Sequence, residues 1–94
     1  MKINLSDQLK QKDQIEIRAT KDGAIALNLN DENYYSLDST AYAIYQQLIS
    51  TCSIKQAISN LIKEFTVSKE DLEKDVLSLA EELVKSQFLE VVSG

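Results

Sequence analysis

Side chains able to carry out catalytic chemistry are scarce in this chain. Its 94 residues include no histidine, so the commonest general base and the commonest metal ligand are both missing. The single cysteine, Cys52, permits neither an internal disulfide nor a cysteine-based zinc site. We therefore expect no catalytic residue, no metal site and no cofactor, and a binding protein rather than an enzyme.

The pair Asp38-Ser39 also has a chemical interpretation. Acyl and peptidyl carrier domains, which are small and acidic too, bear a phosphopantetheine arm on the serine of an Asp-Ser pair. In those domains an apolar residue follows and a helix precedes, whereas here Thr40 follows and predicted strands precede. We interpret the pair as a helix cap, because Asp and Ser both accept hydrogen bonds from the free N–H groups of a first helical turn.

The charge balance disfavours two classes of partner. Ten Lys and Arg residues against fifteen Asp and Glu residues give a net charge of −5. Proteins bind nucleic acids and anionic membranes largely through basic side chains, so we expect neither partner. The sequence has no apolar run long enough for a signal peptide or a membrane span, which indicates, together with the lone cysteine, a reducing cytoplasm.

We expect one domain, residues 1–94, because a chain of this length buries a single hydrophobic core. The segment Ser6–Gln14 is largely polar and has no periodic pattern. Such a segment is typical of a loop, so residues 1–14 are predicted to form a partly flexible arm.

Alternating apolar and polar residues predict three short antiparallel strands after the arm. These strands are expected at Ile15–Thr20, Ala24–Leu29 and Tyr34–Leu37. The Asp22-Gly23 pair between the first two is typical of a tight hairpin turn. The third strand is then an edge of the sheet.

The period of two also assigns side chains to the faces of these strands. In the second strand Ile25, Leu27 and Leu29 share one face. In the third strand the alternation directs Tyr35 inward and Tyr34 toward solvent or a partner.

From residue 38 onward the apolar spacing becomes helical and predicts three helices, the second of them at Ile54–Phe65. Their capping residues are Asp38 or Ser39, Ser53 and Ser68. The third helix carries an apolar stripe broader than packing on one neighbour requires. The stripe consists of Leu72, Val76, Leu79 and Leu83, with Leu77, Ala80 and Val84 beside them. A short strand is predicted at Phe88–Val92.

Three strands followed by three helices form an α+β arrangement similar to a winged helix-turn-helix. That architecture suggests DNA binding. The third helix, however, carries six acidic residues against three lysines between Lys69 and Lys85. A phosphate backbone would repel this helix, so we expect the fold to serve another purpose.

Three segments, in their order and spacing, resemble the family of the pyrroloquinoline-quinone biosynthesis protein D. These PqqD-like proteins are also called precursor-peptide recognition elements of ribosomally made, post-translationally modified peptides (RiPPs). The segments are Tyr34–Ala41, similar to the family's strand-into-helix stretch, Ile54–Phe65, its second helix, and Asp75–Leu83 with Phe88–Val91 after it. The resemblance covers residues 25–92.

The sequence departs from the family's pattern in its loops. The family often has asparagine where Asp38 stands and glycine where Ser50-Thr51 and Gln87 stand. These departures bear on the geometry of the loops more than on the fold.

The resemblance implies a non-catalytic domain that binds the leader region of a precursor peptide. It also implies delivery of the precursor to an enzyme, either a leader peptidase, as in lasso-peptide pathways, or a radical SAM enzyme. In the family the leader adds as a strand beside the third strand and rests against the third helix. The implied peptide-binding residues of this chain are Asn33, Tyr34, Tyr35, Ser36, Leu37, Leu72, Asp75, Val76, Leu79 and Leu83. Strand physics favours the same docking mode, because an edge strand offers unpaired backbone groups to an extended peptide.

Two hypotheses therefore stay open. The first is a peptide-binding protein that presents a precursor to a processing enzyme. The second is a winged-helix adaptor that contacts another protein, or a transcription-factor-like protein. The acidic charge disfavours DNA binding by the second, and a titration with a leader peptide distinguishes the two.

Overall fold

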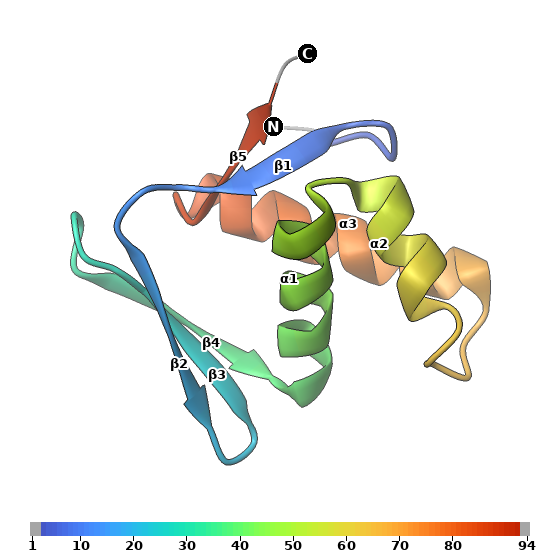
Figure 1. The fold of residues 1–94 in the computed structure, drawn as a ribbon, viewed down its shortest axis with the longest axis horizontal. Helices are drawn as coiled ribbons and strands as arrows, with labels where there is room; N and C mark the ends of the chain where they lie inside the picture. The colour runs from blue at the N-terminus through green and yellow to red at the C-terminus, as the bar shows by residue number, and fades with distance from the viewer. Residues whose placement is uncertain (1–2, 93–94) are drawn as a thin grey trace.

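The computed structural model describes residues 3–92. In chain order its elements are β1 (Gln8–Gln11), β2 (Ile15–Thr20), β3 (Gly23–Asn28), β4 (Asn33–Asp38), α1 (Ser39–Thr51), α2 (Ile54–Leu61), α3 (Lys69–Lys85) and β5 (Leu89–Val92). Figure 1 shows a three-stranded sheet on one side of α1, α2 on the other side, and α3 crossing behind α1. Residues 1–2 of the expected arm and residues 93–94 of the expected domain lie outside the described residues.

The three-stranded sheet is an antiparallel meander in the order β2-β3-β4, which confirms the prediction. Gly23 is paired with Thr20 of β2 and with Asp38 of β4. The φ angle of Gly23 is +156°, and a Cβ atom there would lie 2.0 Å from the carbonyl oxygen of Leu37. Glycine is therefore required at this position, because any side chain would collide with the backbone of β4.

The side chains of β3 alternate as expected, and the buried face is the one that does not carry Ile25, Leu27 and Leu29. Ala24 and Ala26 are 1% and 0% exposed, whereas Ile25 and Leu27 lie on the outer face. Leu29 follows the strand and is 60% exposed. Helix α1 packs over β3, and alanine side chains leave the space that this packing requires.

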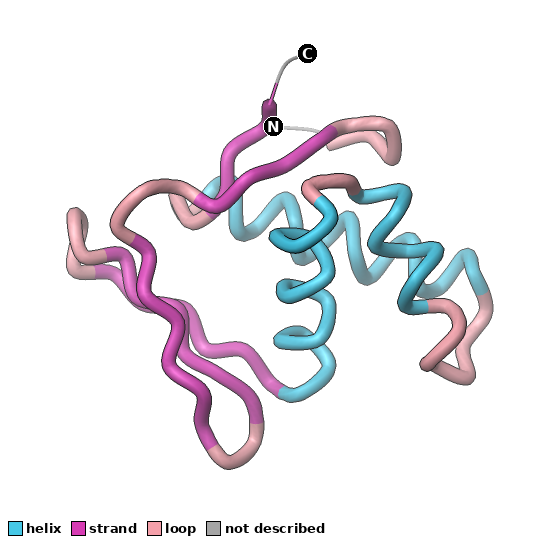
Figure 2. The backbone as a smooth tube through the Cα atoms, in the orientation of Figure 1, coloured by secondary structure: helices cyan, strands magenta, loops and turns pink. Residues whose placement is uncertain are grey.

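The segment that was expected to be a loop contains β1, which forms a second, two-stranded sheet with β5. Leu9 of β1 lies opposite Val91, is fully buried, and donates its N–H to the carbonyl of Cys52 at 3.1 Å. The prediction of an unstructured segment is therefore wrong for residues 8–11. One buried side chain within four residues is too short a pattern to indicate a strand. Figure 2 shows the two sheets as separate groups of magenta strands around the helices.

Capping bonds begin all three helices at predicted residues. Asp38 Oδ1 accepts from Ala41 N at 2.8 Å, Ser53 Oγ from Gln56 N at 3.2 Å, and Ser68 Oγ from Asp71 N at 3.2 Å. Helix α2 ends at Leu61, four residues before the predicted Phe65. The N–H groups of Glu64 and Phe65 both bond to the carbonyl of Leu61, and this turn redirects the chain toward α3.

The hydrophobic core lies between the helices and both sheets. Tyr45 and Leu48 of α1, together with Val76 and Leu83 of α3, are 0% exposed. The Tyr45 hydroxyl donates to Gln11 Oε1 at 2.5 Å, which ties α1 to β1. Within residues 3–92, no helix combines the length and the hydropathy needed to cross a membrane.

Candidate peptide-binding site

Strand β4 is an edge strand, and its bonding pattern shows which backbone groups are open. The N–H of Leu29, just beyond β3, donates to the carbonyl of Gln14 at 2.9 Å. The backbone N–H and C=O groups of successive residues point alternately to the two neighbouring strands. Those of the odd-numbered residues of β3 therefore bond to β2, and those of the even-numbered residues bond to β4. Their partners in β4 are Asn33, Tyr35 and Leu37. The N–H and C=O groups of Tyr34 and Ser36 therefore point to the edge that no strand of residues 3–92 pairs with.

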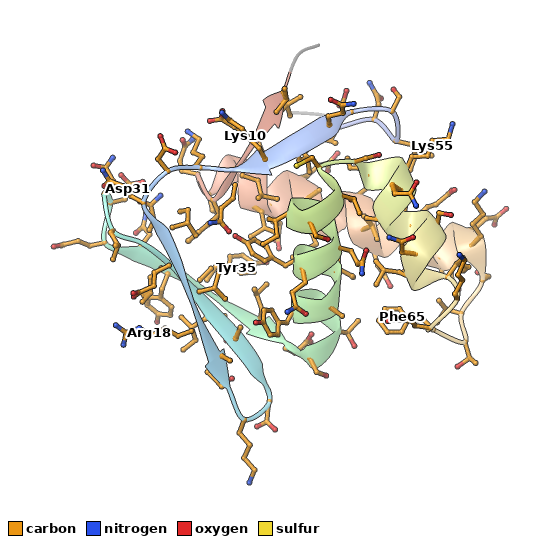
Figure 3. The ribbon with its side chains drawn as sticks, viewed as in Figure 1. Lys10, Arg18, Asp31, Tyr35, Lys55 and Phe65 are labelled. Atoms are coloured by element: carbon orange, nitrogen blue, oxygen red, sulfur yellow. The ribbon has the colours of Figure 1, made fainter. Side chains whose placement is uncertain are left out.

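Tyr35 holds the inner side of β4 against α3. Its hydroxyl donates to Oε2 of Glu82, and its ring meets the Phe88 ring edge-on at a centroid distance of 6.2 Å. Burial, the hydrogen bond to Glu82 and the charge of Glu82 raise the pKa of Tyr35 to about 12. Figure 3 shows Tyr35 pointing from the sheet toward the helices. The side-chain orientations predicted for this strand are confirmed, because Tyr34 on the outer face is 70% exposed.

Two adjoining hollows lie between the start of α1 and α3, with volumes of about 240 and 260 Å³. Both are lined by Thr40, Ile44 and Asp75, and we call them together the α3 groove. Its apolar lining consists of Ala41, Ile44, Phe65, Val67, Leu72 and Leu79. The charged residues of the lining are Asp38, Glu64, Asp75 and Glu82. The groove thus combines an apolar floor with carboxylates.

A larger hollow of about 740 Å³ lies toward the C-terminal end of α3, against β5. It shares Ser78 and Glu82 with the α3 groove, and Lys12 and Lys85 contribute to its lining. The surface beside α3 is therefore acidic next to the start of α1 and mixed in charge beyond Glu82.

The structure divides the residues that the sequence suggested for peptide binding. Leu72, Asp75 and Leu79 line the α3 groove, and residues 33–37 form β4. Val76 and Leu83 are fully buried and line neither hollow of the groove. The broad apolar stripe is not surplus, because α3 packs on α2 along one side and on β5 along another.

Several groove residues escaped the sequence analysis. Glu82 follows Asp75 by seven residues, two helical turns, so this spacing would have placed both on one side of α3. Ala41 and Ile44 border the groove because α1 continues directly from β4 without a loop. No local pattern in the sequence marks those two positions as site residues.

Residues 23–89 match the protein family described as coenzyme PQQ synthesis protein D (PqqD). The chain belongs to the PqqD family. The match runs from the first residue of β3 to the first residue of β5, so it includes β4, the α3 groove and α3 itself. No curated protein matches the sequence.

Two solved structures share the fold of this PqqD-family chain. One is TbiB1 in complex with the TbiA(beta) leader peptide, at 20% identity and a TM-score of 0.81, covering 90% of this chain and 99% of that one. The other is lasso peptide synthetase B1 complexed with the leader peptide, at 24% identity and a TM-score of 0.79, covering 88% and 98%. The likeness in fold thus extends over most of this chain and nearly all of each of the other two.

Proposed function

We propose that this PqqD-family protein binds the leader region of a ribosomally made precursor peptide and presents it to a processing enzyme. The observation that carries the proposal is the open edge of β4, where Tyr34 and Ser36 offer unpaired backbone groups beside α3. Two proteins of the same fold form complexes with leader peptides, which supports this use of the fold.

Strand addition would give the leader both hydrogen bonds and side-chain contacts. Tyr34 and Ser36 together offer two N–H and two C=O groups, each worth roughly 0.5–1.5 kcal/mol when paired. Leader residues opposite Tyr35 and Leu37 would share the inner face of the sheet and reach the α3 groove. Each apolar side chain buried there adds roughly 1.5–3 kcal/mol. Ordering the peptide costs several kcal/mol, so we expect micromolar affinity.

Chemistry on the bound precursor belongs to the partner enzyme, a leader peptidase or a radical SAM enzyme, in a reducing cytoplasm. The chain itself contains no histidine to act as a general base. The proposed peptide-binding residues are Tyr34 and Ser36 through their backbones, and Leu72, Asp75 and Leu79 through their side chains.

A titration of fluorescently labelled candidate leader peptide tests the proposal, with anisotropy as the readout and a scrambled peptide as the matched control. We expect micromolar binding of the leader and much weaker binding of the scrambled peptide. Millimolar binding of every candidate leader would contradict the proposal. A labelled random DNA duplex forms a third arm, and micromolar binding of that duplex would favour a transcription-factor-like role instead.

A further inference from the structure

The charged lining of the α3 groove has a single sign. Its four charged residues are all carboxylates, one at the start of α1, one after α2 and two on α3. They are Asp38, Glu64, Asp75 and Glu82. The salt bridges found within residues 3–92 join Lys10 to Glu90 and Arg18 to Glu16, so neither involves a groove carboxylate.

Two of these carboxylates lie on the same side of α3. Asp75 and Glu82 are two turns apart on α3, and Ser78 lies between them. The Asp38 side chain already accepts from the N–H of Ala41, and Glu82 accepts from the Tyr35 hydroxyl, both of which are neutral donors. Lys74 is next to Asp75 in sequence, but it projects about 100° around the helix from it. Within residues 3–92, the negative charge of the groove thus has no salt-bridged cation against it.

The edge of β4 determines which leader side chains would meet this charge. Side chains directly opposite each other in a sheet share a face, so leader residues opposite Tyr35 and Leu37 face inward. These two leader residues are separated by two positions. The one opposite Tyr35 lies near Glu82, and the one opposite Leu37 lies toward the Asp38 and Asp75 end of the groove.

We propose, on the basis of the leader-binding function proposed above, that the leader carries a lysine or arginine two residues from an apolar side chain. Both side chains point into the α3 groove, the apolar one onto Leu79 and Ile44, and the cation toward Asp75 and its neighbouring carboxylates. The strand edge and the hollow define the site, and the carboxylates select which extended peptide occupies it. Beyond Glu82, the adjoining hollow is lined by Lys12 and Lys85 as well as by Glu81 and Glu90, so its mixed charge favours a cation less than the all-carboxylate lining at the Asp75 end does.

The test is a selection of displayed random peptides, about 12 residues long so that they exceed the length of β4. The full chain is the bait, and its Asp75→Asn and Glu82→Gln variants are parallel baits. The amide introduced by Glu82→Gln keeps an oxygen that can accept from the Tyr35 hydroxyl. Asp22→Asn is the matched control, because it removes one exposed carboxylate that does not line the groove and preserves an Asn-Gly turn.

The wild type and Asp22→Asn should enrich peptides with Lys or Arg two positions from an apolar residue. Asp75→Asn should lose this cation preference and keep the apolar one. A synthetic selected peptide should bind Asp75→Asn about two- to fivefold more weakly than the wild type, the scale of a partly exposed charge pair. Its Lys→Gln counterpart should bind both proteins equally.

Three results would overturn the inference in distinguishable ways. Enriched peptides without Lys or Arg would refute the cation preference, and so would a preference that survives in both groove variants. In either case, slower amide exchange at Tyr34 and Ser36 would leave the strand-addition function standing. Selected peptides that leave those two amides unprotected would contradict both proposals.

Discussion

The hydroxyl of Tyr35 donates to the carboxylate of Glu82 and thereby joins the edge strand to α3 across 47 positions of sequence. This bond holds the inner face of β4 at a fixed distance from the helix that forms the opposite wall of the groove. The contact between the Tyr35 and Phe88 rings joins the same strand to the turn that follows α3. The bond therefore maintains the geometry of the site as well as the stability of the fold.

The first prediction is that alkaline pH destabilises the protein through Tyr35. Its pKa is raised to about 12 in the folded state, above the ordinary tyrosine value of about 10. The stabilisation is therefore complete below pH of about 10 and is lost as the pH rises through about 12. Urea midpoints should fall over this range for the wild type, and the fall should be smaller for Tyr35→Phe.

The titration of Tyr45 and the general effect of removing a tyrosine hydroxyl both need a control. Burial also raises the pKa of Tyr45, so Tyr35→Phe should retain part of the pH dependence. At pH of about 8 the variant should be less stable by roughly 0.5–1.5 kcal/mol, the value of one hydrogen bond. Tyr34→Phe is the matched control, because Tyr34 is 70% exposed. Equal pH dependence in the wild type and Tyr35→Phe would refute the role assigned to Tyr35.

The second prediction concerns amide exchange along β4 on addition of a leader peptide. The N–H groups of Tyr34 and Ser36 point to the open edge, so their exchange should slow markedly when a strand is added there. The amides of Asn33, Tyr35 and Leu37 already bond to β3, so their rates should change little. Residue-resolved hydrogen exchange by NMR measures the pattern. Uniform slowing of all five amides would indicate general stabilisation instead of strand addition.

The sequence was sufficient to predict those features of the fold that depend on residues close together in the chain. The caps at Ser53 and Ser68 and the inward orientation of Tyr35 depend on residues within a few positions of each other, and the structure confirms them. The pairing of β1 with β5 was missed because its partners lie about 80 positions apart and only Leu9 of β1 is buried. The sequence pattern alone did not predict this pairing.

The candidate site was predictable in part for the same reason. The predicted meander placed β4 at the edge of the sheet, but Val76 and Leu83 looked available for peptide binding because the packing of α3 on α2 and β5 was not evident from the sequence pattern. The family resemblance suggested glycine at position 87, and Gln87 indeed adopts a left-handed backbone with φ of +70°. The family pattern thus indicated the left-handed conformation at position 87, which the residue type glutamine does not indicate.

The third prediction uses proline to separate the two sides of β4. Ser36→Pro removes an N–H that points to the open edge, a position where edge strands tolerate proline. The variant should stay folded and bind a leader about two- to tenfold more weakly, the effect of losing one backbone hydrogen bond. Tyr35→Pro is the comparison, because it removes an N–H bonded to β3 as well as the contact with Glu82. Circular dichroism melts and anisotropy titrations of both variants measure the contrast, and equal loss of stability in the two would contradict the assigned bonding direction.

The last prediction is that Gly23→Ala disrupts β4 from the side on which β4 pairs with β3. Gly23 has a φ of +156°, and an added Cβ would lie 2.0 Å from the carbonyl oxygen of Leu37 and 2.8 Å from the carbonyl carbon of Asp38. Both the backbone angle and the collision are unfavourable, and each costs roughly 1–3 kcal/mol. We therefore expect a loss of at least about 2 kcal/mol in the free energy of unfolding. The neighbouring Asp22→Asn should change the free energy of unfolding by less than about 0.5 kcal/mol, because it is an exposed substitution that preserves the turn.

Relief of the collision by shifting the end of β4 would also displace Asp38, which caps α1 and forms part of the groove wall. Leader binding by Gly23→Ala should consequently weaken even at temperatures where the variant is folded, and unchanged affinity there would show that the groove does not depend on this end of β4.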